Sequence, residues 1–136
     1  AAVAGSLMAL VLSSIIHKEV NLPMMLNGAL AGLVAITAGP DYPTMELSVL
    51  IGSIGGAVMF IATPLFDKVK VDDPVGALSV HLVPGIWGTL AVGIFKEGGS
   101  IIAQLQGIGA IGAFVFVSSF VVWFILKKTV GIRTEN

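Results

Sequence analysis

The sequence has 136 residues, of which 56% are hydrophobic and 11% charged, and its mean hydropathy is +1.01. Soluble domains carry about 25% charged residues, and a chain this short cannot hide so much apolar surface from water. The net charge of −1 and the scattered basic residues argue against nucleic-acid binding, and the absence of cysteine excludes disulfides and thiolate metal sites. No phosphate-binding loop, dinucleotide fingerprint, zinc motif or catalytic-triad spacing is present, so we expect neither an enzyme nor a bound cofactor or metal.

Clusters of charged and turn-forming residues divide the chain into five apolar stretches, of which the first is truncated and the second is short. A helix needs about 20 residues to cross the hydrocarbon layer, and lipid offers no hydrogen-bond partners to unpaired backbone groups. We therefore predict an all-α integral membrane protein, a polytopic bundle with about five spans at residues 1–16, 22–39, 45–66, 72–95 and 100–126.

Most basic residues fall on one side of these spans. With five crossings the loops alternate sides, and only Lys96 lies opposite the other six, which are Lys18, Lys68, Lys70, Lys127, Lys128 and Arg133. The positive-inside rule places the more basic side, and with it the C-terminus, in the cytoplasm. The chain starts inside an apolar run with neither an initiator Met nor a basic leader, so we expect the natural protein to be longer.

Small residues recur four positions apart in the second and third stretches, in the pairs Gly28–Gly32 and Gly52–Gly56. Small residues at this spacing let helix backbones approach closely in lipid. The pattern predicts a tightly packed bundle but indicates no substrate.

His81 is the residue that most suggests a function. If the fourth helix starts at Asp73, a rise of 1.5 Å per residue places His81 about 12 Å along it, near the middle of the membrane. An ionisable group there is costly and normally faces a cavity or a partner. Its predicted face is apolar, so we expect a neutral imidazole that both donates and accepts hydrogen bonds. The residues predicted to share that face are Ala77, Leu78, Pro84, Gly85 and Gly88.

Other polar and aromatic residues are better explained by structure. Asp73 is expected to cap the fourth helix and Pro74 to occupy its first position. His17 is expected to be a solvated residue at a helix end. Asn27 is expected to pack between helices, and Trp87 to pack or to anchor at the membrane surface.

Three segments resemble the Amt ammonium transporters. Residues 27–39 (NGALAGLVAITAG) are similar to a small-residue helix of that family, and residues 130–133 (VGIR) are similar to the segment after its last helix. Residues 71–95 (VDDPVGALSVHLVPGIWGTLAVGIF) resemble the later family helix that carries the second of two pore histidines. The resemblance runs in the same order over nearly the whole chain.

The resemblance implies an eleven-helix fold, of which residues 1–136 are the C-terminal part, from the seventh helix to the eleventh. It makes His81 the second pore histidine, Ala77 an apolar pore-lining residue and Asp73 a structural aspartate. Gly76 departs from relatives that carry an aspartate there. The first half of the fold, with the first pore histidine and the outer cation site, is missing, so we expect this stretch alone not to form the pore.

The expected function is transport of ammonium or ammonia through a histidine-lined apolar pore. The resemblance further implies a homotrimer in the lipid bilayer of the plasma (inner) membrane and a cytoplasmic regulatory partner of the PII type. Two alternatives stay open. One is an ammonium sensor fused to a signalling module, and the other is a structural subunit of a larger membrane complex in which His81 is merely hydrogen-bonded.

Overall fold

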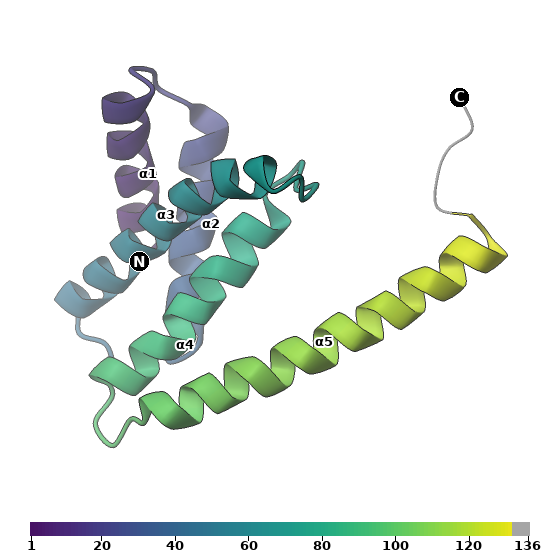
Figure 1. Cartoon of the computed structure of the whole chain (residues 1–136). Coiled ribbons are helices and arrows are strands. Elements are labelled where there is room, and N and C mark those ends of the chain that lie inside the picture. The colour runs from purple at the N-terminus through teal and green to yellow at the C-terminus, as the bar shows by residue number, and fades with distance from the viewer. Residues whose placement is uncertain (132–136) are drawn as a thin grey trace. The chain divides into compact units, whose positions relative to one another are not determined.

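The computed structural model describes residues 1–131, and Arg133, one of the six basic residues on the more basic side, lies outside this range. The described residues form only helices and loops (Figure 1), which confirms the predicted all-α class. The elements are α1 (Ala2–Ile16), α2 (Leu22–Thr37), α3 (Met45–Lys68), the π-helical turn η1 (Leu78–Leu82), α4 (Val83–Phe95) and α5 (Ile101–Thr129).

The helices differ in whether they are long enough to cross a membrane. Within residues 1–131, three helical segments are both long and apolar enough, namely Met45–Lys68, Leu78–Phe95 and Ile101–Thr129. The helices α1 and α2 are also apolar but have only 15 and 16 residues. The five predicted spans therefore correspond to five helices, of which the first two are short, as the sequence suggested.

The chain divides into two units, Ala1–Gln104 and the part from Leu105 onward. The second unit consists mainly of α5, which is almost entirely apolar and has no second helix beside it among the described residues of that unit. A helix that is apolar all round needs lipid or another protein surface around it.

Glycine contacts hold α1, α2 and α3 together in the first unit. A Cβ added to Gly28 would lie 2.6 Å from the Cβ of Ala9, and one added to Gly56 would lie 2.8 Å from the Cα of Gly5. Both distances are shorter than carbon atoms tolerate. The backbone of α3 at Gly56 therefore packs directly on the backbone of α1, and the backbone of α2 at Gly28 packs on the methyl group of Ala9. The predicted close packing at Gly28, Gly32, Gly52 and Gly56 is confirmed, since all four are buried and touch a neighbouring helix or the residue at its start.

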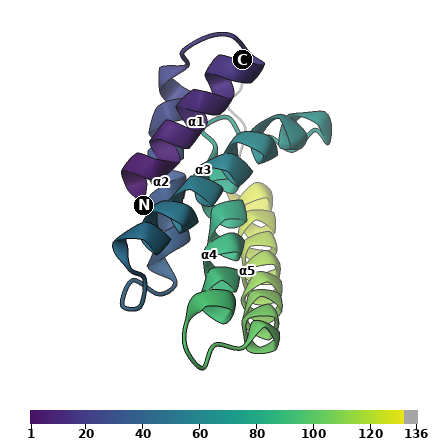
Figure 2. The same ribbon diagram turned by 90° about the vertical axis from the view of Figure 1, so that its left-hand side faces the viewer.

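The helix α4 packs against α2 and α3, and Figures 1 and 2 show the four helices α1 to α4 gathered in one bundle. Ala35, Ile51 and Ala91 form a buried cluster at this contact. Gly88 brings α4 close to the backbone of α2, where an added Cβ would lie 2.8 Å from the carbonyl carbon of Ala35. The indole N–H of Trp87 donates a hydrogen bond of 3.0 Å to the carbonyl oxygen of Ile51, so Trp87 packs inside the bundle.

An ion pair joins the loops that follow α2 and α4. The Nζ of Lys96 lies 2.9 Å from Oδ2 of Asp41, and both side chains are largely exposed. The hydrogen bond from Lys96 lowers the pKa of Asp41 below its usual value of 3.8. The contact places the ends of α2 and α4 at the same end of the bundle, as expected if successive helices alternate direction.

Candidate functional site

His81 lies in η1, just before α4 begins. The predicted start of the helix at Asp73 is wrong, because residues 71–76 form an irregular segment with a turn, and the continuous helical segment begins at Leu78. Pro74 is an exposed turn residue and not the first residue of the helix. The expected position of His81, about 12 Å along its helix, is also wrong, since His81 is in the first turn.

Asp73 nevertheless binds the free backbone groups at the start of the helix, from a position further upstream than expected. Its Oδ1 accepts a hydrogen bond of 2.9 Å from the N–H of Leu78. Its Oδ2 accepts bonds of 3.0 Å from the N–H and 2.9 Å from the hydroxyl of Ser79. Three hydrogen bonds stabilise the charged form of this carboxylate. Two of them come from backbone N–H groups at the start of the helix, which would otherwise have no partner within the helix.

The segment before η1 reaches into the bundle. Gly76 is buried with φ of +75°, and a Cβ there would lie 3.0 Å from Nδ2 of Asn27 on α2. Val80 belongs to a buried cluster with Ala9, Ala31 and Met59, which lie at or near the middle of α1, α2 and α3. His81, the next residue, is therefore level with the middle of these three helices. Its depth in a membrane stays a prediction.

His81 and Ala77 are exposed in this chain, whereas Ser79 and Val80 between them are buried. Pro84 and Gly88, which were predicted to share the face of His81, are buried against the neighbouring helices, so that part of the predicted face is wrong. His81 lies inside the π-turn, whose wider spacing departs from the uniform helical register that the prediction assumed. His81 and Ala77 remain together on an uncovered side of the bundle.

Ser79 was not predicted to be a site residue. A serine two residues before a histidine is the only local signal, and its contact with Asp73 depends on the turn at residues 74–76. His17, in contrast, lies at the end of α1 as expected, with its ring centroid 5.5 Å from that of Phe60.

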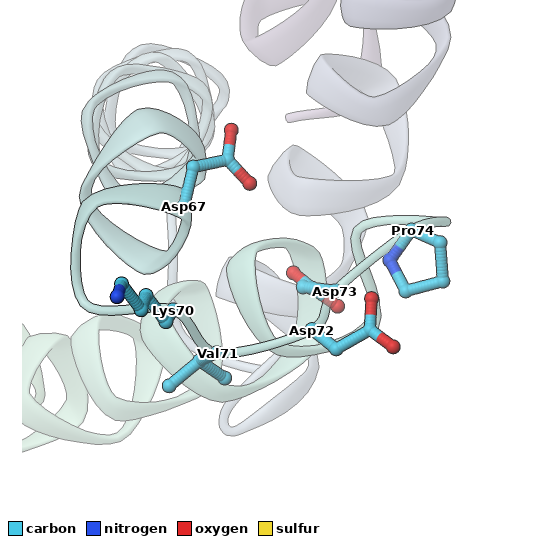
Figure 3. Close-up of a pocket in the computed structure, with 6 residues that line it drawn as sticks. All are labelled: Asp67, Lys70, Val71, Asp72, Asp73 and Pro74. Atoms are coloured by element: carbon cyan, nitrogen blue, oxygen red, sulfur yellow. The ribbon is translucent and has the colours of Figure 1, made fainter.

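A hollow of about 320 Å³ lies where α3 ends and the segment before η1 begins (Figure 3). Half of its six lining residues are acidic, and the lining consists of Asp67, Lys70, Val71, Asp72, Asp73 and Pro74. Across residues 1–131, no three His, Asp or Glu side chains are arranged to hold a metal ion. The hollow thus supplies a polar surface beside Asp73 but no metal centre.

Comparisons of the sequence and of the structure with known proteins all lead to the same family. The sequence model described as Ammonium Transporter Family matches residues 1–136. The chain is 35% identical to ammonium transporter Amt2 of Archaeoglobus fulgidus, over 99% of this chain and 33% of that protein. It is 33% identical to the ammonium transporter of Bacillus subtilis, over 100% of this chain and 38% of that protein.

A solved structure described as Sensor Amt Protein superimposes on this chain with a TM-score of 0.92 and 30% sequence identity. The match covers 98% of this chain and 36% of that structure. The chain therefore spans about a third of the length of the proteins that it matches.

Proposed function

Because the chain belongs to the ammonium transporter family, we propose that it is the C-terminal part of a longer protein that moves ammonium or ammonia across a membrane. The observation that carries this proposal is the position of His81. It is exposed on one side of the bundle and level with the middle of three apolar helices. A membrane-embedded ionisable group placed this way normally faces a pathway for a polar solute.

The side of the bundle that carries His81 and Ala77 is the proposed wall of the pore. One half of a transporter supplies only one wall of a pore, so a second half is needed to enclose it. Many transporters have their pathway between two such halves. The matched proteins are about three times as long as this chain, which supports the presence of that second half in the complete transporter.

Two side chains then have different roles in the pore. A neutral imidazole at His81 both donates and accepts hydrogen bonds, so it exchanges them with ammonia or ammonium in place of water. Ala77, four residues earlier and also exposed, presents a methyl group that offers water no partner. Together they replace part of the solvation of a small polar molecule without a fixed charge that would trap it.

The orientation and the partners are also proposals. The six-to-one distribution of basic residues supports a cytoplasmic C-terminus. We propose the plasma (inner) membrane as the location of the protein, as the family resemblance implies. The exposed apolar side chains of α5, such as Phe114 and Phe116 at 73% exposure each, are suited to lipid or to neighbouring subunits of a homotrimer. A PII-type protein is the proposed regulatory partner on the cytoplasmic side.

A sensor is the second candidate, because the matched solved structure is described as Sensor Amt Protein. Transport is preferred because the full-length relatives are named as transporters. The two are separated by flux, since a sensor that only binds ammonium would not carry it at a transporter's rate.

The test compares three preparations of liposomes that contain an internal pH dye. They hold the complete transporter, the 136-residue chain alone, or no protein, and each receives an ammonium jump. We expect rapid pH change only with the complete transporter, because the chain alone supplies one wall of the pore. A complete transporter that matches empty liposomes would refute transport, and flux through the 136-residue chain would refute the two-half pore.

A further inference from the structure

The turn that carries His81 departs from α-helical geometry, and the side chain of Ser79 in this turn is hydrogen-bonded to Asp73, which precedes it. Residues 78–82 form a π-helical turn, in which hydrogen bonds span one residue more than in an α-helix. Ser79 lies in this turn and is fully buried. Both its N–H and its hydroxyl bond to the same carboxylate oxygen of Asp73.

The width of this turn sets how the residues before it are rotated relative to α4, and His81 lies within it. Successive residues of an α-helix are rotated by about 100°, the value for 3.6 residues per turn. One extra residue in a turn therefore rotates the side chains before it by up to about that angle relative to α4. Pro84 and Gly88 of α4 are buried, whereas His81, which lies inside the turn, is exposed.

We propose that Ser79 is a positioning residue for His81: its hydroxyl bond to Asp73 holds the wide turn in the register that points His81 into the pore. This inference rests on the proposed function, because it assumes that His81 contacts the transported molecule. Ser79 itself is buried and does not reach that molecule.

Several hydrogen bonds around Ser79 link the residues from Asp73 to Val80 to one another. The N–H of Gly76 donates to the carbonyl of Asp73 at 3.1 Å, and the N–H of Val80 donates to the carbonyl of Gly76 at 2.8 Å. Leu78 and Ser79 donate to the carboxylate of Asp73. The Ser79 hydroxyl is the one side-chain donor among these bonds, so its removal takes away one of the three bonds that tie the turn to the carboxylate of Asp73 and weakens the hold on its register.

Gly76 and Asn27 of α2 leave little space beside the Ser79 hydroxyl. A Cβ at Gly76 would lie 3.2 Å from Oγ of Ser79 and 3.0 Å from Nδ2 of Asn27. The hydroxyl is thus enclosed between Asp73, Gly76 and α2. A buried hydroxyl bonded to a carboxylate has few alternative orientations, which suits a fixed support for the next side chains.

The experiment is a double-mutant cycle in the complete transporter, with ammonium flux measured per amount of folded, monodisperse protein. Ser79→Ala removes the hydroxyl, and we expect transport to slow about ten-fold, the factor for losing one hydrogen bond to a charged group. In a His81→Ala background the same substitution should change the remaining flux little, because two residues that act together are not additive. Ser79→Thr keeps the donor and should retain most of the rate.

Selectivity gives a second readout that a loss of stability would not move. We expect Ser79→Ala to change the ratio of ammonium to methylammonium flux in the same direction as His81→Ala does. The matched control is Thr89→Val on α4, where the lost hydroxyl donates only to the carbonyl of Gly85 within the same helix. This control should leave the ratio at the wild-type value.

The outcomes separate the two claims. If Ser79→Ala leaves rate and ratio unchanged, or slows transport equally in both backgrounds, while His81→Ala impairs transport, the positioning role is wrong and the proposed pore stands. If His81→Ala itself has no effect, the proposed pore fails and the inference fails with it.

Discussion

A single methyl group at Gly56 should destabilise the bundle of α1, α2 and α3. In Gly56→Ala the new Cβ would lie 2.8 Å from the Cα and 2.9 Å from the carbonyl carbon of Gly5. Both are backbone atoms of α1, so no side-chain rotation relieves the contact and the helices must separate. Overpacking of this kind costs about 1–3 kcal/mol, against a gain of about 0.5–1 kcal/mol in helix propensity from glycine to alanine. The midpoints of these two ranges leave a net loss of about 1 kcal/mol.

The assay is reversible unfolding of the complete transporter in mixed micelles of increasing SDS fraction, followed by circular dichroism. Gly85→Ala on α4 is the matched control, because its added Cβ would meet only Cγ1 of Val34 at an ordinary distance of 3.7 Å. This control should be as stable as the wild type or slightly more stable. If Gly56→Ala were equally stable, the helices would not be in backbone contact there and the packing account would be refuted.

Three further predictions concern other parts of the bundle. Trp87→Phe removes the indole bond to the carbonyl of Ile51 and should lower stability by about 1 kcal/mol, measured in the same micelle assay, with Trp123→Phe on α5 as the control. The stabilising contact of Asp41 with Lys96 should be present above pH about 3.8 and lost as the pH falls through the lowered pKa of Asp41, and Lys96→Met should return that pKa toward 3.8 in an NMR titration. Cysteines placed at positions 68 and 98 should react with an impermeant reagent from opposite sides of the membrane, and labelling of position 68 from outside intact cells would contradict the orientation.

Local composition was enough to predict most helix ends. Charged residues such as Lys18, Lys68 and Lys96 interrupt the apolar runs, and the structure ends α1, α3 and α4 at or beside them. The glycine pairs were equally readable, because spacing by four residues places small side chains on one face of a helix. Both the helix ends and the glycine pairs depend on residues close together in the sequence, so they could be predicted without the structure.

The start of the histidine helix could not be predicted in this way. Asp73 followed by Pro74 has the pattern of a helix N-terminus, yet Gly76 adopts φ of +75° and the chain turns before it becomes helical. The turn is accommodated by contacts with distant residues, such as Asn27 beside Gly76 and the core cluster around Val80. A π-turn has no sequence signature of its own, so the shared face predicted for His81 was partly wrong.

The most direct test of the account is the ammonium flux of the complete transporter with and without His81→Ala, in liposomes with equal amounts of folded protein. If His81 lies in the wall of the pore, the substitution should change the rate or the selectivity of transport while assembly is retained. Wild-type rate together with wild-type discrimination between ammonium and methylammonium in His81→Ala would contradict it.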